Sequence, residues 1–187
     1  MPAGNLGNTA AFGRALVEAK TYGLIPKLPR LAAIQAAGAA PFATSFKAGF
    51  APLQRVEPHT VATAINIGNP ASFDRAVRSI RDTNGVVTTV SDDEILEAKA
   101  VIDAAGVGCE PASAASVAGV RRLVRDGTIK SSERVVAVLT GHLLKDPTAV
   151  TRYHEETEPA PAYANRPVEI EASIEAIERA VEGGNGR

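Results

Sequence analysis

Short apolar segments alternate with helix-like segments along most of this 187-residue chain, and that alternation restricts the fold more than any other feature. The expected strands cover residues 31–37, 86–90 and 134–139. The expected helices cover residues 9–22, 72–82, 91–105 and 112–125. Strands joined through a helix pair in parallel, because a tight turn can connect only antiparallel neighbours. The sequence therefore predicts an α/β fold with a largely parallel sheet flanked by helices.

Local sequence signals support this assignment and indicate where individual helices and irregular segments begin. Ser91 and Glu94 have the spacing of a capping box, which starts a helix. Asp146 followed by a proline predicts a further short helix with Asp146 as its N-cap. The many prolines and glycines of residues 40–58 predict an irregular segment. After an acidic, proline-rich stretch, a last amphipathic helix is expected, with its apolar residues at Ile170, Ile174, Ile177 and Val181.

The first eight residues hold the most informative motif, a glycine- and asparagine-rich loop that leads directly into a helix. Its residues are Gly4, Asn5, Leu6, Gly7 and Asn8. Glycine and asparagine tolerate positive φ, so successive N–H groups are expected to turn toward one point. The N-terminus of the following helix adds unpaired N–H groups and a positive dipole end. The loop is therefore a candidate phosphate cradle, although a helix-starting turn that binds nothing is the simpler interpretation.

The spacing of this loop excludes two common nucleotide motifs. It does not match the dinucleotide fingerprint, and no Lys-Ser or Lys-Thr pair follows it as in a P-loop. Phosphate loops usually follow a strand, yet only three residues precede this one. We therefore expect that a preceding part of the protein is missing.

Composition excludes several classes of partner. The net charge is −1, so no bulk attraction to nucleic acid or to an anionic membrane is expected. No apolar run has the length of a membrane span, and no signal peptide is evident. The three histidines and the one cysteine are scattered, so no metal site is predicted. A single cysteine is consistent with a cytoplasmic location.

Five segments, in order, resemble the threonine synthase family. They are PAGNLGN (2–8), QAAGAAP (35–41), ATAINIGNPAS (62–72), CEPASAA (109–115) and LTGHLLKDP (139–147). The resemblance implies the fold-type II architecture of pyridoxal-phosphate enzymes, which is like that of the tryptophan synthase β chain. It implies that the cofactor is pyridoxal 5'-phosphate, with the loop of residues 4–8 on its phosphate and Thr140 on its pyridine nitrogen. Loops near the ring are implied at Gly68, Asn69, Glu110 and Ser113.

The family reaction converts O-phospho-L-homoserine into L-threonine and phosphate. It needs a Schiff-base lysine, which the family carries in a Ser-Phe-Lys-Asp-Arg-Gly motif before the phosphate loop. Lys47 follows Ser-Phe here, but it lies after the loop and lacks the Asp-Arg pair, so it is not the counterpart. We therefore expect no catalytic residue in this chain, a missing N-terminal half as partner, and no activity of the chain alone.

The resemblance extends to about residue 147 and implies a division of the chain. Residues 1–150 are expected to form a partial enzyme domain, 151–168 an exposed connector, and 169–187 a helix with a disordered end. A homo-oligomer is also expected, because an unpaired half would expose an apolar face.

Single residues near the motifs have simpler roles than catalysis. His142 is expected to support its loop through a hydrogen bond, Cys109 to fill the core, and Ser113 to cap the helix that follows it. Leu143 stands where the family usually has glycine, so the loop next to Thr140 is expected to differ from that of the family.

Three alternative functions stay open at this point. Another fold-type II enzyme, such as a threonine or serine dehydratase, has the same cofactor loop. A non-catalytic interaction protein derived from the enzyme half is the second alternative. A KH-type nucleic-acid loop is disfavoured, because the glycine loop has no flanking basic residues.

Overall fold

The structure is a computed structural model that describes residues 1–156 and 159–184 of the chain. Its α-helices are α1 (Gly7–Thr21), α2 (Pro41–Lys47), α3 (Phe73–Asp82), α4 (Asp92–Ala104), α5 (Pro111–Arg125), α6 (Pro147–Thr151) and α7 (Ile174–Gly184). Its strands are β1 (Ala32–Ala36) and β2 (Val86–Val90). Short 3-10 turns cover Ala37–Ala39 and Thr63–Ile65, and a π-helical turn covers Arg152–Glu156.

The sheet is parallel, as the alternation of elements predicted. β1 and β2 pair from Ala32 opposite Val86 to Ala36 opposite Val90. The first residues of the chain extend this sheet, because Pro2 forms a parallel bridge with Ile34. The N–H of Ala3 donates to the Ile34 carbonyl at 2.8 Å. The glycine-rich loop therefore begins at the carboxyl end of a parallel pairing, where binding loops of α/β folds lie.

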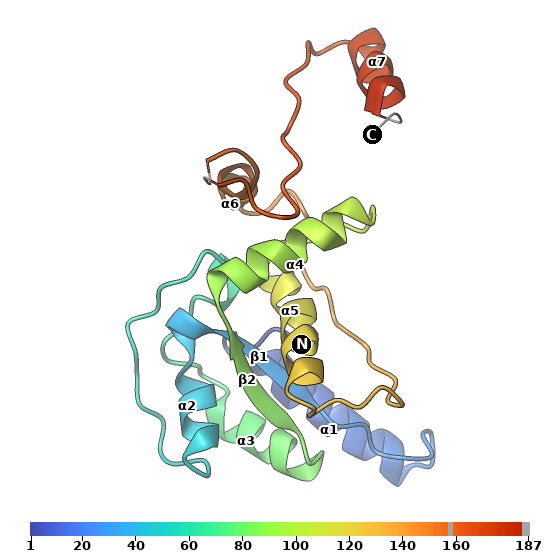
Figure 1. Cartoon of the computed structure of the whole chain (residues 1–187). Coiled ribbons are helices and arrows are strands. Elements are labelled where there is room, and N and C mark those ends of the chain that lie inside the picture. The colour runs from blue at the N-terminus through green and yellow to red at the C-terminus, as the bar shows by residue number, and fades with distance from the viewer. Residues whose placement is uncertain (157–158, 185–187) are drawn as a thin grey trace.

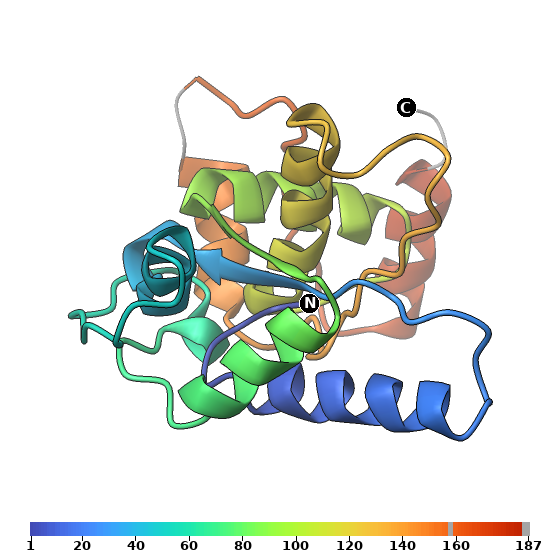
Figure 2. The same cartoon turned by 90° about the horizontal axis from the view of Figure 1, so that it is seen from below.

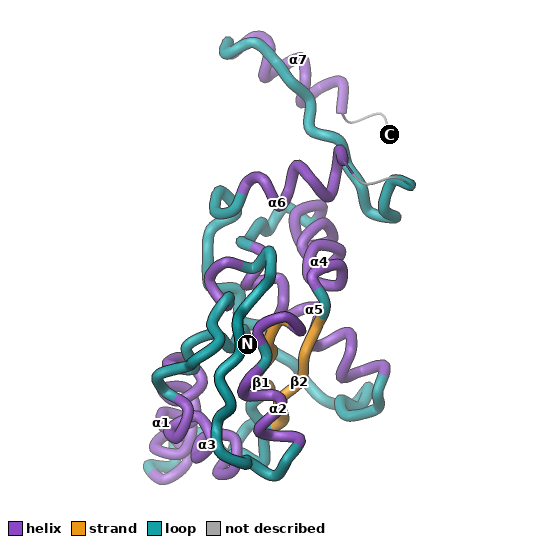
Figure 3. Tube along the Cα trace, turned by 90° about the vertical axis from the view of Figure 1, so that its left-hand side faces the viewer, coloured by secondary structure: helices purple, strands orange, loops and turns teal. Residues whose placement is uncertain are grey.

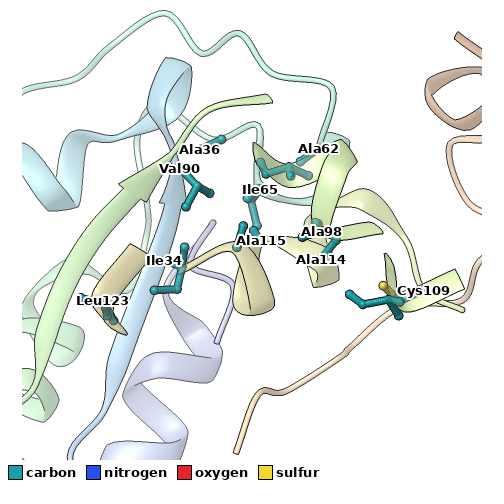
Figure 4. Close-up of a cluster of buried hydrophobic side chains, with 14 residues drawn as sticks. Ile34, Ala36, Ala62, Ile65, Val90, Ala98, Cys109, Ala114, Ala115 and Leu123 are labelled. Carbon is teal, nitrogen blue, oxygen red and sulfur yellow. The ribbon is translucent and has the colours of Figure 1, made fainter. Parts of the chain in front are cut away.

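Helices cover both faces of this small sheet, with α1 and α3 on one side and α4 and α5 on the other (Figures 1 and 2). Side chains alternate between the faces, as the pleat requires. Ile34, Ala36 and Val90 belong to the core cluster under α4 and α5, drawn in Figure 4. Ala33 and Val87 belong to a second cluster with residues of α2 and α3. The predicted α/β arrangement, a parallel sheet flanked by helices, is confirmed.

Two helical glycines let neighbouring elements approach closely. A Cβ on Gly119 of α5 would overlap the side chain of Ile34 in β1. A Cβ on Gly13 of α1 would overlap the Cβ of Ser79 in α3, whose hydroxyl donates to the Ala10 carbonyl at 3.2 Å. A chain with few aromatic side chains fills its core in this way, by bringing backbones together.

The predicted capping box forms with both of its hydrogen bonds. The Glu94 N–H donates to Ser91 Oγ at 3.2 Å, and the Ser91 N–H donates to Glu94 Oε2 at 2.8 Å. Arg122 of α5 also donates to the Glu94 carboxylate, at 2.8 and 2.9 Å. These contacts join α4 to α5 and hold the pKa of Glu94 below its usual range, although partial burial acts in the opposite direction.

The strand predicted at 134–139 is wrong. The structure assigns no strand there, and in the described residues this backbone forms no ladder with β1 or β2. The Val138 carbonyl accepts from Ser116 Oγ of α5 at 2.9 Å instead. A β-branched sequence becomes a strand only where a neighbouring strand pairs with it, and residue 138 contacts the side chain of a helix instead.

The irregular segment predicted at 40–58 is partly wrong, because α2 occupies its beginning. Pro41 takes the first helical position, where its missing N–H costs nothing. The N–H groups of Phe42 and Ala43 both donate to Gln35 Oε1 at 2.9 Å. A side chain from β1 thus caps a helix whose own sequence contains no capping residue.

The C-terminal part departs from the expected boundaries. The connector expected from residue 151 begins with helical residues, and Tyr153 among them is buried. The helix expected from Ile170 begins only at Ile174 and lies at the end of an extended segment, away from the sheet (Figures 1 and 3). The disordered end expected at residues 185–187 lies outside the described residues. No helix in the described ranges is long and apolar enough to span a membrane.

We predict that Gly13→Ala lowers the free energy of unfolding by about 1–3 kcal/mol, because the new methyl group has no room against Ser79. Gly7→Ala in the same helix is the matched control, since its Cβ meets nothing within 4 Å. Urea denaturation followed by circular dichroism measures both. Equal stability of the two variants would show that the α1–α3 contact is not closely packed.

Candidate functional site

A cavity of about 270 Å³ brings together four segments that are far apart in the chain. The N-terminal loop contributes Pro2, Gly4, Asn5, Leu6, Gly7 and Asn8. The segment after α2 contributes Ala64, Ile65 and Ile67. The start of α5 and the loop before α6 contribute Glu110, Ala112 and Thr140. The fold therefore joins the predicted phosphate loop to the predicted ring-nitrogen residue in one cavity.

The glycine-rich loop takes a different backbone conformation from the one expected. Leu6, not a glycine or an asparagine, has positive φ, at 65°. Its side chain is buried at 2% exposure, so packing holds a residue that would otherwise avoid this region. Gly4 is needed for a different reason, because a Cβ there would lie 3.0 Å from the Ala64 carbonyl oxygen and the Ile65 Cα. Gly7 faces open space.

Asn5 fixes the loop to the start of α3. Its Oδ1 accepts from the Ala71 N–H at 2.7 Å, and its carbonyl accepts from the Ser72 N–H at 3.2 Å. In the described residues, no protein group accepts from the N–H groups of Gly7 and Asn8, which open the first turn of α1. These donors and the helix dipole give this end of the cavity the character of an anion site.

The opposite end of the cavity holds a hydroxyl in a fixed network. Ser113 Oγ accepts from the N–H groups of Thr140 and Gly141 at 2.8 and 2.9 Å. It also lies 3.0 Å from Thr140 Oγ1. The expectation that Ser113 caps its helix is wrong: the N-cap of α5 is Glu110, and Ser113 binds the 140–141 backbone instead. Ser113 itself does not line the cavity.

Glu110 places a buried carboxylate at the same end. Its side chain is 4% exposed, and its Oε1 lies 3.5 Å from Thr140 Oγ1. Its Oε2 is 3.3 Å from Lys145 Nζ, an ion-pair contact without hydrogen-bond alignment. The Gly141 carbonyl accepts from the Glu110 N–H at 3.1 Å, and a Cβ on Gly141 would overlap the Glu110 carboxylate. A Cβ at residue 141 would therefore displace the Glu110 carboxylate.

Gly68 and Asn69 do not reach the cavity. The Gly68 carbonyl accepts from the Val56 N–H at 3.1 Å, and a Cβ on Gly68 would overlap the Val56 carbonyl. Gly68 thus allows two loops to run close together, while Asn69 is exposed. Ile65 and Ile67, in the same segment of residues 62–72, line the cavity instead. Their apolar side chains within this family-like segment are the sequence feature that could have identified them.

The other residues singled out in the sequence make structural contacts. His142 Nδ1 accepts from the Leu144 N–H at 3.2 Å, so this histidine supports its loop. Leu143 packs against Gly108, where a Cβ would lie 2.6 Å from Leu143 Cδ2. Asp146 does precede a helix, α6, but its carboxylate accepts from Thr63 Oγ1 at 2.8 and 3.0 Å and does not cap it.

Comparison with known families identifies this arrangement. A family model described as "Pyridoxal-phosphate dependent enzyme" matches residues 1–141. The chain belongs to this family. The matched region contains the loop of residues 4–8 and ends just after Thr140. Every residue that lines the cavity of this pyridoxal-phosphate dependent enzyme therefore lies within the matched region.

The curated relatives with high similarity are threonine synthases. The chain is 43% identical over 185 residues to that of Methanosarcina acetivorans, covering 98% of this chain and 43% of that protein. It is 38% identical over 181 residues to that of Methanocaldococcus jannaschii, covering 96% of this chain and 42% of that protein. The chain therefore spans less than half the length of these relatives. The predicted resemblance to threonine synthase is confirmed.

Solved structures confirm the fold class. Threonine synthase from Escherichia coli aligns with a TM-score of 0.60 at 18% identity, over 96% of this chain and 37% of that one. A threonine deaminase from T.th. aligns with a TM-score of 0.51 at 21% identity, over 68% of this chain and 43% of that one. At these identities the likeness establishes the shared fold-type II architecture alone.

We predict that Cys109 stays unmodified in the folded protein. Its side chain is 1% exposed, and burial raises the pKa of its thiol to about 11. At pH 8 its reaction with a thiol reagent should therefore be at least about a hundredfold slower than in denaturant, where the pKa is near 8.5. The rate of thiol labelling with and without guanidinium measures this difference. Rapid labelling in native buffer would contradict the buried position.

Proposed function

We propose that this chain forms the part of a threonine synthase that binds the phosphate and the ring nitrogen of pyridoxal 5'-phosphate. The observation that carries the proposal is the single cavity with free N–H donors at one end and the Thr140 hydroxyl at the other. The relatives named threonine synthase favour this reaction over others of the family.

The phosphate would be held by the backbone of Gly4, Asn5, Leu6, Gly7 and Asn8. A doubly charged phosphate would accept from the N–H groups that have no protein partner and would lie at the positive end of the α1 dipole. The Asn5 contacts to residues 71 and 72 would keep these donors in place. Apolar Ile65 and Ile67 would exclude water from the ring between the two polar ends.

At the other end, Thr140 would donate a hydrogen bond to the pyridine nitrogen. The bound cofactor supplies a conjugated ring that accepts the electron pair released at the substrate carbon. A neutral hydroxyl beside the nitrogen, unlike a carboxylate, leaves the ring unprotonated. Glu110 would lie near the ring, while Gly68, Asn69 and Ser113 would act by shaping the loops around the site.

The substrate would be O-phospho-L-homoserine, converted with water into L-threonine and phosphate. The reaction requires a lysine that moves protons, and none of the six lysines of the chain lines the cavity. We propose that a further segment of the enzyme supplies this lysine and closes the site. Residues 1–150 would form the enzyme part, followed by a link and the terminal helix α7, in a cytoplasmic homo-oligomer.

A dehydratase of the same fold is the second candidate, because the likeness to threonine deaminase extends over the shared architecture. A non-catalytic interaction protein is the third. Product analysis separates the enzymes, since a synthase yields threonine and a dehydratase yields a 2-oxo acid and ammonia.

We predict that Asn8→Pro weakens binding of pyridoxal phosphate about tenfold or more. Proline is tolerated in the first turn of a helix, and it removes one N–H from the proposed phosphate site. A charge-assisted hydrogen bond contributes about 1.5–3 kcal/mol. Asn8→Ala is the matched control, because it keeps the N–H. Calorimetric titration measures both variants, with pyridoxal as the ligand that lacks phosphate.

Two results would contradict the cradle. One is that pyridoxal binds the unmodified chain as tightly as its phosphate ester does. The other is that Asn8→Pro and Asn8→Ala bind pyridoxal phosphate equally well. Either result would leave residues 4–8 as a turn that starts α1.

We predict that the 187-residue chain alone releases no phosphate from O-phospho-L-homoserine, because no lysine lines its cavity. A chimera in which this chain replaces the matching segment of the Methanosarcina acetivorans threonine synthase should release phosphate and threonine together. Thr140→Val in the chimera should lower the rate, since the ring nitrogen loses its donor. A folded chimera that forms a 2-oxo acid and no threonine would favour the dehydratase alternative.

A further inference from the structure

The network around Thr140 determines which way its hydroxyl proton points. Ser113 Oγ accepts two backbone hydrogen bonds, from the N–H groups of Thr140 and Gly141. A hydroxyl oxygen has two lone pairs, so both are used. The Ser113 proton must therefore be donated, and Thr140 Oγ1, at 3.0 Å, is the acceptor within reach.

Thr140 is consequently an acceptor toward Ser113, and its own proton points elsewhere. The other group near Thr140 Oγ1 is Glu110 Oε1 at 3.5 Å. A well-formed bond from a hydroxyl to a carboxylate measures about 2.5–2.7 Å, so this contact holds the proton weakly. Thr140 lines the cavity, and its proton is available to an acceptor placed there.

We propose that Ser113 is a positioning residue that orients the Thr140 proton toward the cofactor ring nitrogen. This inference rests on the proposed function. Ser113 is fully buried and does not line the cavity, so it can affect a ligand there only through residues 140 and 141. Its place in the first turn of α5, a helix buried against β1, gives the network a rigid support. When the cofactor binds, the Thr140 hydroxyl would turn its hydrogen bond from Glu110 Oε1 to the ring nitrogen, and the proton would stay on Thr140 Oγ1.

The test compares pyridoxal phosphate with its analogue in which C–H replaces the ring nitrogen. The unmodified chain should bind pyridoxal phosphate about threefold to tenfold more tightly, the gain of one hydrogen bond. Ser113→Ala should lose most of this preference, although Thr140 keeps its hydroxyl. Thr140→Val should abolish it, and the double variant should match Thr140→Val, because Ser113 acts through that hydroxyl.

A purely structural role for Ser113 would weaken both ligands equally and leave the preference unchanged. Ser113→Cys provides a second variant if Ser113→Ala does not fold. The cysteine sulfur would lie beside the two N–H groups, but a thiol is only a weak hydrogen-bond donor. Ser113→Cys should therefore also lose the preference for pyridoxal phosphate over its analogue. Circular dichroism confirms that each variant is folded. Titration with inorganic phosphate tests whether residues 4–8 still bind an anion, independently of the contact with the ring.

The outcomes separate the two proposals. If the unmodified chain binds neither phosphate nor pyridoxal phosphate, the proposed function fails and the role of Ser113 fails with it. If phosphate binds but the unmodified chain does not distinguish the two ring compounds, the proposed contact of Thr140 with the ring nitrogen fails, and the role of Ser113 fails with it. If the unmodified chain distinguishes them and a folded Ser113 variant keeps the full preference, only the Ser113 inference fails.

Discussion

The side-chain amide of Gln35 connects the parts of the molecule on which the site depends. Its Nε2 donates to the Ala3 carbonyl at 3.0 Å, and its Oε1 accepts the first two N–H groups of α2. The side chain is fully buried, so each of these groups would lose its partner without it. Leaving buried polar groups unpaired costs about 1–3 kcal/mol each. This one amide therefore fixes the residue before the glycine-rich loop, the strand β1 and the helix α2 relative to one another.

The polar groups of the site belong mainly to the backbone. The unpaired donors at the start of α1 are main-chain N–H groups. Asn5 accepts from a main-chain N–H just before α3, and Ser113 accepts from the main-chain N–H groups of residues 140 and 141. Such donors carry no net charge, which agrees with a chain whose total charge is −1. Under the proposed function, the site would attract an anion through local geometry and not through the charge of the whole surface.

The sequence was a good guide where a signal is local. The capping box at Ser91 and Glu94 and the β-branched run of β2 both carry their information within a few residues, and both elements form where they were predicted. The sequence was a poor guide where a residue far away in the chain determines the local structure. Residues 134–139 have the composition of a strand but contact helix α5 through Val138 and pair with neither strand. Helix α2 is capped by Gln35 from another element. The same limit applies to Ser113, whose partners lie 27 and 28 residues away.

The left-handed backbone of Leu6 bears on whether the loop has its conformation before any ligand binds. A left-handed backbone costs a non-glycine residue about 1–2 kcal/mol, whereas burying a leucine side chain gains about 1.5–3 kcal/mol. Because its side chain is buried in the core, the burial holds the strained turn at φ 65° without help from any ligand. The donors of the first helical turn are thus arranged before an anion arrives. Under the proposed function, association with an anion would then lose little chain entropy at this loop.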